Sequence, residues 1–255
     1  MLHQFSRNEL AIGKEGLEVL RNSSAAVLGI GGVGSFSAEA LVRSGIGRII
    51  LVDKDNIDIT NVNRQLHALL STVGRSKVDV MKERLLDINP ECDIEALKMF
   101  YTDETYEDFF KEAPDYIIDA SDTITYKIHL IKESIRRGVP IISSMGAANK
   151  MDPGSLRVMD LFETANDPIA RVMRRELRKA GITDKVEVVF SDETPIQIKE
   201  SARKEIVPEG AEQSGIRKAK MPPSSNAFVP SVAGLIAAGH VISNLLKDIT
   251  IERIN

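Results

Sequence analysis

Basic and amide side chains lie where the chain could bind the phosphates of a nucleotide. Arg64 falls in a donor-rich segment with Asn63 and Gln65, and Lys77 opens a predicted helix. A triphosphate that loses pyrophosphate needs fixed cations beyond what backbone amides supply. We therefore expect Arg64 and Lys77 to hold phosphates. Composition alone also allows both to be ordinary surface charges.

A glycine-rich segment lies upstream, between a continuous apolar run at 25–30 and an Ala/Glu/Leu-rich stretch that ends at Arg43. Its glycines fit the dinucleotide-binding fingerprint, in which the backbone turns tightly and approaches a phosphate at a helix N-terminus. A tight turn without a ligand is the alternative, but the flanking strand and helix favour a nucleotide site. The glycines are Gly29, Gly31, Gly32 and Gly34.

Acidic residues follow two of the predicted strands. Asp53 ends the second strand, where an acid hydrogen-bonds ribose hydroxyls, and Asp55 lies two residues beyond it. NAD and ATP both carry that ribose, so Asp53 does not choose between them. Asp122 follows the strand at 116–119. It could hold magnesium in the same crevice, or cap the helix that we expect to begin at Thr123.

The elements that must position these residues alternate between strand and helix. Apolar runs predict strands at 25–30, 48–53, 94–97, 116–119, 139–143, 156–159 and 186–190, with helices between most of them. This order predicts an α/β fold with a doubly wound, mostly parallel sheet, a Rossmann-like nucleotide site and a C-terminal extension.

We expect one domain over residues 1–255, with a nucleotide-binding core at 5–145 and a long mobile loop at 191–226. The strand and helix pattern loosens beyond Met151, which predicts that the core ends there. The apolar run at 228–246 is interrupted by Pro230 and His240 and suits a buried helix or a membrane span.

Bulk properties narrow the class of protein. A net charge of −4 disfavours nucleic-acid binding over the whole surface, so any polyanion must be bound locally. Cys92 is the only cysteine, which excludes an intrachain disulfide and a Cys-x-x-Cys metal clip. A reducing, cytoplasmic compartment and an ordinary soluble enzyme fit best.

Taken in order, the glycine loop, Asp53, the Asn63-Arg64-Gln65 segment, Lys77 and Asp122 resemble the adenylating domain of ubiquitin-activating enzymes and their molybdopterin and thiamin relatives. The resemblance covers about residues 5–145. It implies that Asp53 binds ribose, that Arg64 and Lys77 bind the phosphates of ATP, and that Asp122 holds magnesium. It also implies a homodimer in which Arg7 reaches the ATP of the neighbouring subunit.

Within this superfamily, the chain looks most like the tRNA threonylcarbamoyladenosine dehydratases. The matching segments are 60–68 (TNVNRQLHA), 89–92 (NPEC) and 228–234 (FVPSVAG). The resemblance implies ATP-driven cyclisation of a threonylcarbamoyl group on a tRNA adenosine through an acyl-adenylate, with AMP and pyrophosphate released. It leaves open a monovalent cation near the site and a sulfur-transfer protein partner.

Three alternatives remain. The chain could adenylate the C-terminus of a ubiquitin-like or sulfur-carrier protein, although it has no paired cysteines for zinc and no cysteine in its second half for a thioester. An NAD-dependent oxidoreductase is disfavoured by Arg64 and Lys77 and by the lack of an evident hydride-site histidine. A catalytically silent nucleotide-binding subunit would not need Arg64, Lys77 and Asp122.

A predicted helix at 167–180 offers a local basic surface through which an acidic protein could bind tRNA. Its arginines recur at helical spacing and form one basic stripe, opposite an apolar stripe that can pack on the core. A solvated helix face is the alternative. The arginines are Arg171, Arg174, Arg175 and Arg178, and the basic residues of the expected loop that could close over the same ligand are Arg217, Lys218 and Lys220.

Overall fold

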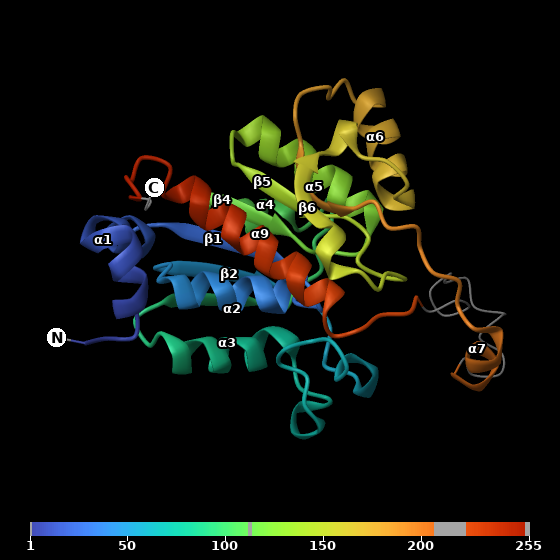
Figure 1. Cartoon of the computed structure of the whole chain (residues 1–255), viewed down its shortest axis with the longest axis horizontal. Helices are drawn as coiled ribbons and strands as arrows, with labels where there is room; N and C mark the ends of the chain where they lie inside the picture. The colour runs from blue at the N-terminus through green and yellow to red at the C-terminus, as the bar shows by residue number, and fades with distance from the viewer. Residues whose placement is uncertain (1, 112–113, 207–222, 253–255) are drawn as a thin grey trace.

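The computed structural model describes residues 2–111, 114–206 and 223–252 and contains a seven-stranded sheet with helices on both faces (Figure 1). The strand order is β3-β2-β1-β4-β5-β7-β6. All neighbouring strands are parallel except β6, which runs antiparallel to β7. The predicted α/β doubly wound sheet is therefore confirmed. The strands are β1 (Ser24–Leu28), β2 (Arg48–Val52), β3 (Asp93–Leu97), β4 (Tyr116–Asp119), β5 (Ile141–Ser144), β6 (Leu156–Asp160) and β7 (Glu187–Ser191).

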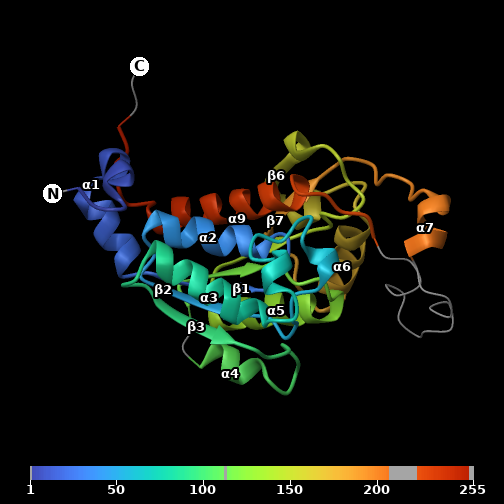
Figure 2. The same ribbon diagram turned by 90° about the horizontal axis from the view of Figure 1, so that it is seen from below.

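Helices cover the two faces of the sheet as separate layers (Figure 2). Successive residues of a strand point to opposite faces, so the apolar runs of β1, β2 and β4 supply both layers. The helices α2 (Gly34–Ser44), α3 (Lys77–Ile88) and α9 (Val229–Leu245) pack on one face. The helices α4 (Tyr106–Phe110), α5 (Ile124–Arg137) and α6 (Pro168–Lys179) pack on the other.

The apolar run at 228–246 forms α9, which lies along α2 over the sheet (Figure 1). The two helices approach closely at Gly234, where an added Cβ would lie 2.3 Å from the carbonyl oxygen of Val33. Ser37 Oγ donates a hydrogen bond to the carbonyl oxygen of Gly234 at 2.9 Å. The run is therefore a buried helix, one of the two alternatives that the sequence allowed. Within the described residues, no helix is long and apolar enough to cross a membrane.

The structure departs from the sequence predictions in its C-terminal half. The prediction that the core ends near Met151 is wrong, because β7 pairs with β5 and continues the same sheet. The expected loop at 191–226 contains the helix α7 (Glu200–Ile206), so it is not without regular structure. Residues 207–222, including Arg217, Lys218 and Lys220, lie outside the described residues. At the other end, the helix α1 (Ser6–Arg21) was not predicted from the sequence.

Candidate functional site

A cavity of about 1220 Å³ opens at the carboxyl ends of the parallel strands. It spans the switch point between β1 and β4, where the chain turns to opposite sides of the sheet and where such folds bind ligands. Nearly all the predicted nucleotide-binding residues line it: Gly29, Gly31, Gly32, Asp53, Asn63, Arg64, Gln65, Lys77 and Asp122.

The glycine loop joins β1 to α2 and cannot carry side chains at its two ends. Gly29 has φ of 89°, and an added Cβ would lie 2.7 Å from the carbonyl oxygen of Ala120. At Gly34 an added Cβ would lie 1.9 Å from the carbonyl oxygen of Gly29. No side chain caps the N-terminus of α2. The amide of Ser35 donates to the carbonyl oxygen of Gly31 at 3.1 Å. The helix dipole favours the negative charge of a phosphate at this end.

Asp53 fixes the glycine loop from the end of β2. Its carboxylate accepts hydrogen bonds from the backbone amides of Ile30 at 2.8 Å and Asp55 at 2.9 Å. Burial raises the pKa of Asp53, and the charge of Lys77 opposes that rise. This arrangement leaves Asp53 beside the first turn of the loop, where a ribose hydroxyl can reach it.

Lys77 is a buried cation at the start of α3. Its Nζ lies 3.2 Å from Asp55 Oδ2 and 3.8 Å from Asp53 Oδ2. Only 7% of Lys77 is exposed, so its charge acts in a medium that screens it weakly. Asp55 is half exposed and does not line the cavity, but its ion pair with Lys77 connects it to a residue that does.

Arg64 lines the cavity beside the glycine loop, where an added Cβ on Gly32 would lie 3.4 Å from its Cγ. Its guanidinium donates to the carbonyl oxygen of Thr60 at 2.7 Å and to Asn63 Oδ1 at 3.0 Å. Burial lowers the pKa of Arg64. The adjacent Gln65 is buried, and its Oε1 has no hydrogen-bond partner among the described residues. This loop therefore presents one cation to a ligand, with a buried amide beside it.

Asp122 follows β4 and is exposed to the cavity. Thr123 Oγ1 donates to its Oδ1 at 3.3 Å. The N-cap of α5 is Thr123, whose side chain makes no capping bond. In the part of the chain that is described, no three His, Cys, Asp or Glu residues gather as a metal site. A cation at Asp122 would therefore need oxygen atoms from a bound nucleotide or from water to complete its coordination.

Two buried ion pairs that the sequence analysis missed support the cavity walls. Lys127 Nζ lies 2.9 Å from Asp119 Oδ2 and donates to the carbonyl oxygen of Ser121 at 3.0 Å, which fixes the turn before Asp122. Lys150 Nζ lies 3.2 Å from Asp167 Oδ2. The only sequence signal for either pair is a lysine among apolar neighbours.

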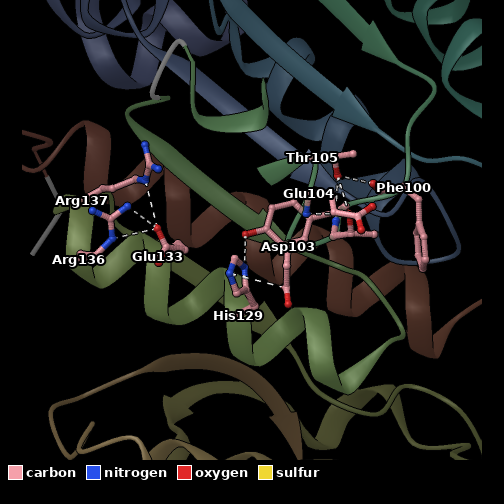
Figure 3. A network of polar contacts seen from close by, with 10 residues as sticks. Phe100, Asp103, Glu104, Thr105, His129, Glu133, Arg136 and Arg137 are labelled. Carbon is pink, nitrogen blue, oxygen red and sulfur yellow. Dashed lines mark hydrogen bonds and ion pairs between the residues drawn. The ribbon is translucent and has the colours of Figure 1, made fainter. Parts of the chain in front are cut away.

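Aromatic residues form the edge of the cavity beyond β3. Phe100 is partly exposed there, with Tyr126 edge-on at 4.9 Å and Lys54 Nζ 4.1 Å above its ring. Figure 3 shows how this segment is held: Tyr101 OH and His129 Nδ1 lie 3.0 Å apart, and Thr105 Oγ1 donates to the carbonyl oxygen of Phe100 at 2.6 Å. The first contact ties the segment to α5, and the second holds the segment's own turn.

Arg7 and the arginines of α6 lie outside the cavity lining. Arg7 is exposed on α1, at the end of the molecule away from α6 and α7 (Figure 1). Within one chain, therefore, Arg7 does not join the other site residues. The α6 stripe begins next to the cavity, because Asp167, Pro168 and Ile169 line it.

Comparisons with known proteins agree with this geometry. The model of the ThiF family matches residues 5–253. The tRNA threonylcarbamoyladenosine dehydratase of Bacillus subtilis (strain 168) is 69% identical over 254 residues, which cover 100% of this chain and 99% of that protein. A second relative, the tRNA threonylcarbamoyladenosine dehydratase of Escherichia coli (strain K12), is 40% identical over 65% of this chain and 62% of its own length.

Solved structures extend the comparison to bound nucleotides. The E. coli tRNA N6-threonylcarbamoyladenosine dehydratase TcdA in complex with ATP matches with a TM-score of 0.83 and 31% identity, over 96% of this chain and 94% of that chain. The same protein in complex with AMP matches with a TM-score of 0.83 and 32% identity, over 96% and 95% of the two chains.

Proposed function

The chain belongs to the ThiF family, and we propose that it uses ATP to cyclise, with loss of water, the threonylcarbamoyl group of a modified adenosine in tRNA. The observation that carries the proposal is the set of charges around one cavity. The N-terminus of α2, Arg64 and Lys77 all present positive charge next to the ribose-binding position of Asp53. A dinucleotide bridge would not require the two additional cations.

The same cavity accommodates the rest of ATP. Asp53 receives the ribose hydroxyls at the end of β2, which directs the base toward the neighbouring end of β3. There Phe100 and Tyr126 offer apolar surface for the base, and Lys54 Nζ lies over the Phe100 ring. The ATP and AMP complexes of the E. coli relative support this cofactor.

Magnesium fits the carboxylate of Asp122. Proteins commonly bind this ion through one or two carboxylates, with water and nucleotide phosphates as the remaining ligands. Asp122 is exposed to the cavity, and the fixed turn before it orients its side chain. Bound there, the ion would add positive charge at the phosphates.

The reaction proceeds in two steps. In the first, a carboxylate oxygen of the substrate attacks the α-phosphorus of ATP, and the bond to the β-phosphate breaks, releasing pyrophosphate. Arg64 and Lys77 stabilise the charge that develops on the phosphates. In the second, a nucleophile within the same threonylcarbamoyl group attacks the activated carbonyl and loses a proton. AMP leaves with the carboxylate oxygen, so the net loss from the substrate is one water.

No enzyme nucleophile is needed for ring closure, because the internal nucleophile is already next to the activated carbonyl. Cys92, the only cysteine of the sequence, is buried away from the cavity between α3 and β3. Burial raises the pKa of its thiol to about 12, which keeps it protonated and unreactive. A thioester intermediate at the cavity would have no thiol among the lining residues to form on.

We further propose that the protein is a cytoplasmic homodimer in which Arg7 completes the site of the partner. Arg7 is exposed and lies outside the cavity lining of its own chain. A closed two-fold dimer would bring each α1 to the other subunit and repeat the contact in both directions.

Purified protein, ATP, magnesium and tRNA carrying threonylcarbamoyladenosine test the proposal. We expect AMP and pyrophosphate in equal amounts and a tRNA nucleoside lighter by one water. Lys77→Ala should lower the rate by about 100-fold or more while circular dichroism shows a folded protein. Cys92→Ala is the matched control and should turn over normally. ADP as the product, or normal turnover by Lys77→Ala, would exclude adenylation at this site.

A further inference from the structure

The helix α6 carries more positive charge than its surroundings neutralise. Its apolar side, with Ala170, Met173 and Leu177, is buried against α5 and β7. The opposite side exposes cationic residues over three turns, with only Glu176 among them. The exposed cations are Arg171, Arg175, Arg178 and Lys179.

The structure separates these cations by what they contact. Arg174, which the sequence pattern placed in the stripe, is half-buried and donates to Thr164 Oγ1. Burial lowers its pKa, and the nearby Arg178 and Arg171 lower it further. Arg175 pairs with the adjacent Glu176 at 2.7 Å, and Arg178 lies over the ring of Phe162. Arg171 makes no ion pair within the described residues, so an outer face with one acid and several cations remains.

The position of α6 connects this face to the cavity. Asp167 caps the helix by accepting from the amide of Ala170 at 2.9 Å, and Lys150 fixes the other carboxylate oxygen. Both Asp167 and Lys150 line the cavity. Arg171 lies one turn further along the helix, and Arg178 about 10 Å beyond Arg171 at 1.5 Å per residue. The cations therefore extend outward from the cavity mouth.

We propose that this exposed face of α6 binds the phosphodiester backbone of tRNA next to the nucleotide that enters the cavity. The inference rests on the proposed function, since it assigns the docking surface for that substrate. A protein of net charge −4 gains little from a general attraction to polyanions, so it needs a local basic surface. Guanidinium groups suit phosphate because they donate two parallel hydrogen bonds. If the face were only solvated, reversing its charges would leave the affinity for tRNA unchanged.

The test reverses the two outward arginines nearest the cavity. Arg171→Glu/Arg175→Glu should weaken binding of the substrate tRNA by at least about tenfold near 0.1 M salt. The slope of log affinity against log salt should fall by roughly 1.5, since two phosphate contacts are lost. ATP affinity should not change, because neither residue lines the cavity. Arg171→Gln/Arg175→Gln should show a smaller loss in the same direction and covers the case in which the reversed variant fails to fold.

The matched control makes the same change in net charge elsewhere. Lys111 follows α4 and Lys247 follows α9. Both are exposed, and neither lies on α6, on α1 or in the cavity lining. Lys111→Glu/Lys247→Glu should keep the affinity and salt slope of the wild type.

Unchanged tRNA affinity in the folded α6 variants would overturn the inference, and so would an equal loss in the control. Either result would leave dehydration by the wild-type protein intact. Absence of dehydration and of tRNA binding in the wild type would instead reject the proposed function and the docking surface together.

Discussion

At the scale of single residues, the site concentrates charges that would be costly without their partners. Lys77 lies within 4 Å of two carboxylates in a buried position, which offsets its desolvation. A nucleotide phosphate arriving at α2 would meet an ammonium already held in place. Such preorganised charge stabilises a transition state because it needs no rearrangement during the reaction.

His67 is buried beside this group, and neither of its ring nitrogens has a hydrogen-bond partner within the described residues. Burial, together with the charges of Lys77 and Arg84, lowers the pKa of His67 to about 4. An unfolded histidine takes up a proton below about pH 6.5. The neutral ring therefore contributes stability above pH 6.5 that is lost as the pH falls toward 4.

We predict that lowering the pH from 7 to 4.5 reduces the free energy of unfolding of the wild type by about 2 kcal/mol more than that of His67→Leu. Urea unfolding at the two pH values measures the difference. The comparison with the wild type cancels the other groups that titrate in this range. Equal losses in both proteins would show that the His67 pKa is not lowered in the folded state.

The sequence predicted the residues that line the cavity better than the residues that support them. Strand ends are recognisable from apolar runs, and parallel strands bring their carboxyl ends to one edge, so Asp53 and Asp122 could be assigned to one crevice. Lys127 and Lys150 could not be assigned, because a buried lysine is recognised only by a partner that the fold supplies. The role of Gln65 as an unsatisfied acceptor also depends on burial.

At the scale of elements, the start of α9 packs the C-terminal segment against the glycine loop. An added Cβ on Gly32 would lie 3.1 Å from Pro230 Cβ, so the start of α9 packs against the glycine loop. The sequence predicted a helix here but not its partner. It missed α1, whose helix is interrupted at Gly13 with φ of 70°. A glycine inside a segment disfavours a helix, so the sequence gives little sign of this one.

Gly234→Ala tests the contact between α9 and α2. The new methyl group would collide with the carbonyl oxygen of Val33 and force the helices apart, which we expect to lower the free energy of unfolding by about 1 to 3 kcal/mol. The KM for ATP should rise, because Pro230 would move with the helix.

Gly239→Ala on the same helix is the control. No heavy atom lies within 4 Å of the position of its added Cβ, so the alanine should raise stability by about 0.5 to 1 kcal/mol through helix propensity. Urea unfolding compares the two variants. A stable Gly234→Ala protein with unchanged KM would contradict the close packing of α9 on α2.

At the scale of the whole molecule, Arg7 distinguishes a complete site within one chain from a site shared between two. We predict that Arg7→Ala and Lys77→Ala are each inactive alone and that mixing them restores activity. In a mixed dimer one site has both residues intact, so free exchange of subunits gives about a quarter of the wild-type rate. Rates measured after mixing and incubation provide the test. No recovery, despite mixed dimers shown by mass spectrometry, would place Arg7 outside the partner's site.

The central claim is that the substrate carboxylate itself receives AMP. Its most direct test uses tRNA in which both carboxylate oxygens of the threonylcarbamoyl group are ¹⁸O. If the carboxylate attacks the α-phosphorus and AMP later leaves with that oxygen, mass spectrometry will find one ¹⁸O in each AMP and one remaining in the cyclised nucleoside. Unlabelled AMP alongside a dehydrated nucleoside, or ¹⁸O in phosphate with ADP as product, would contradict the acyl-adenylate.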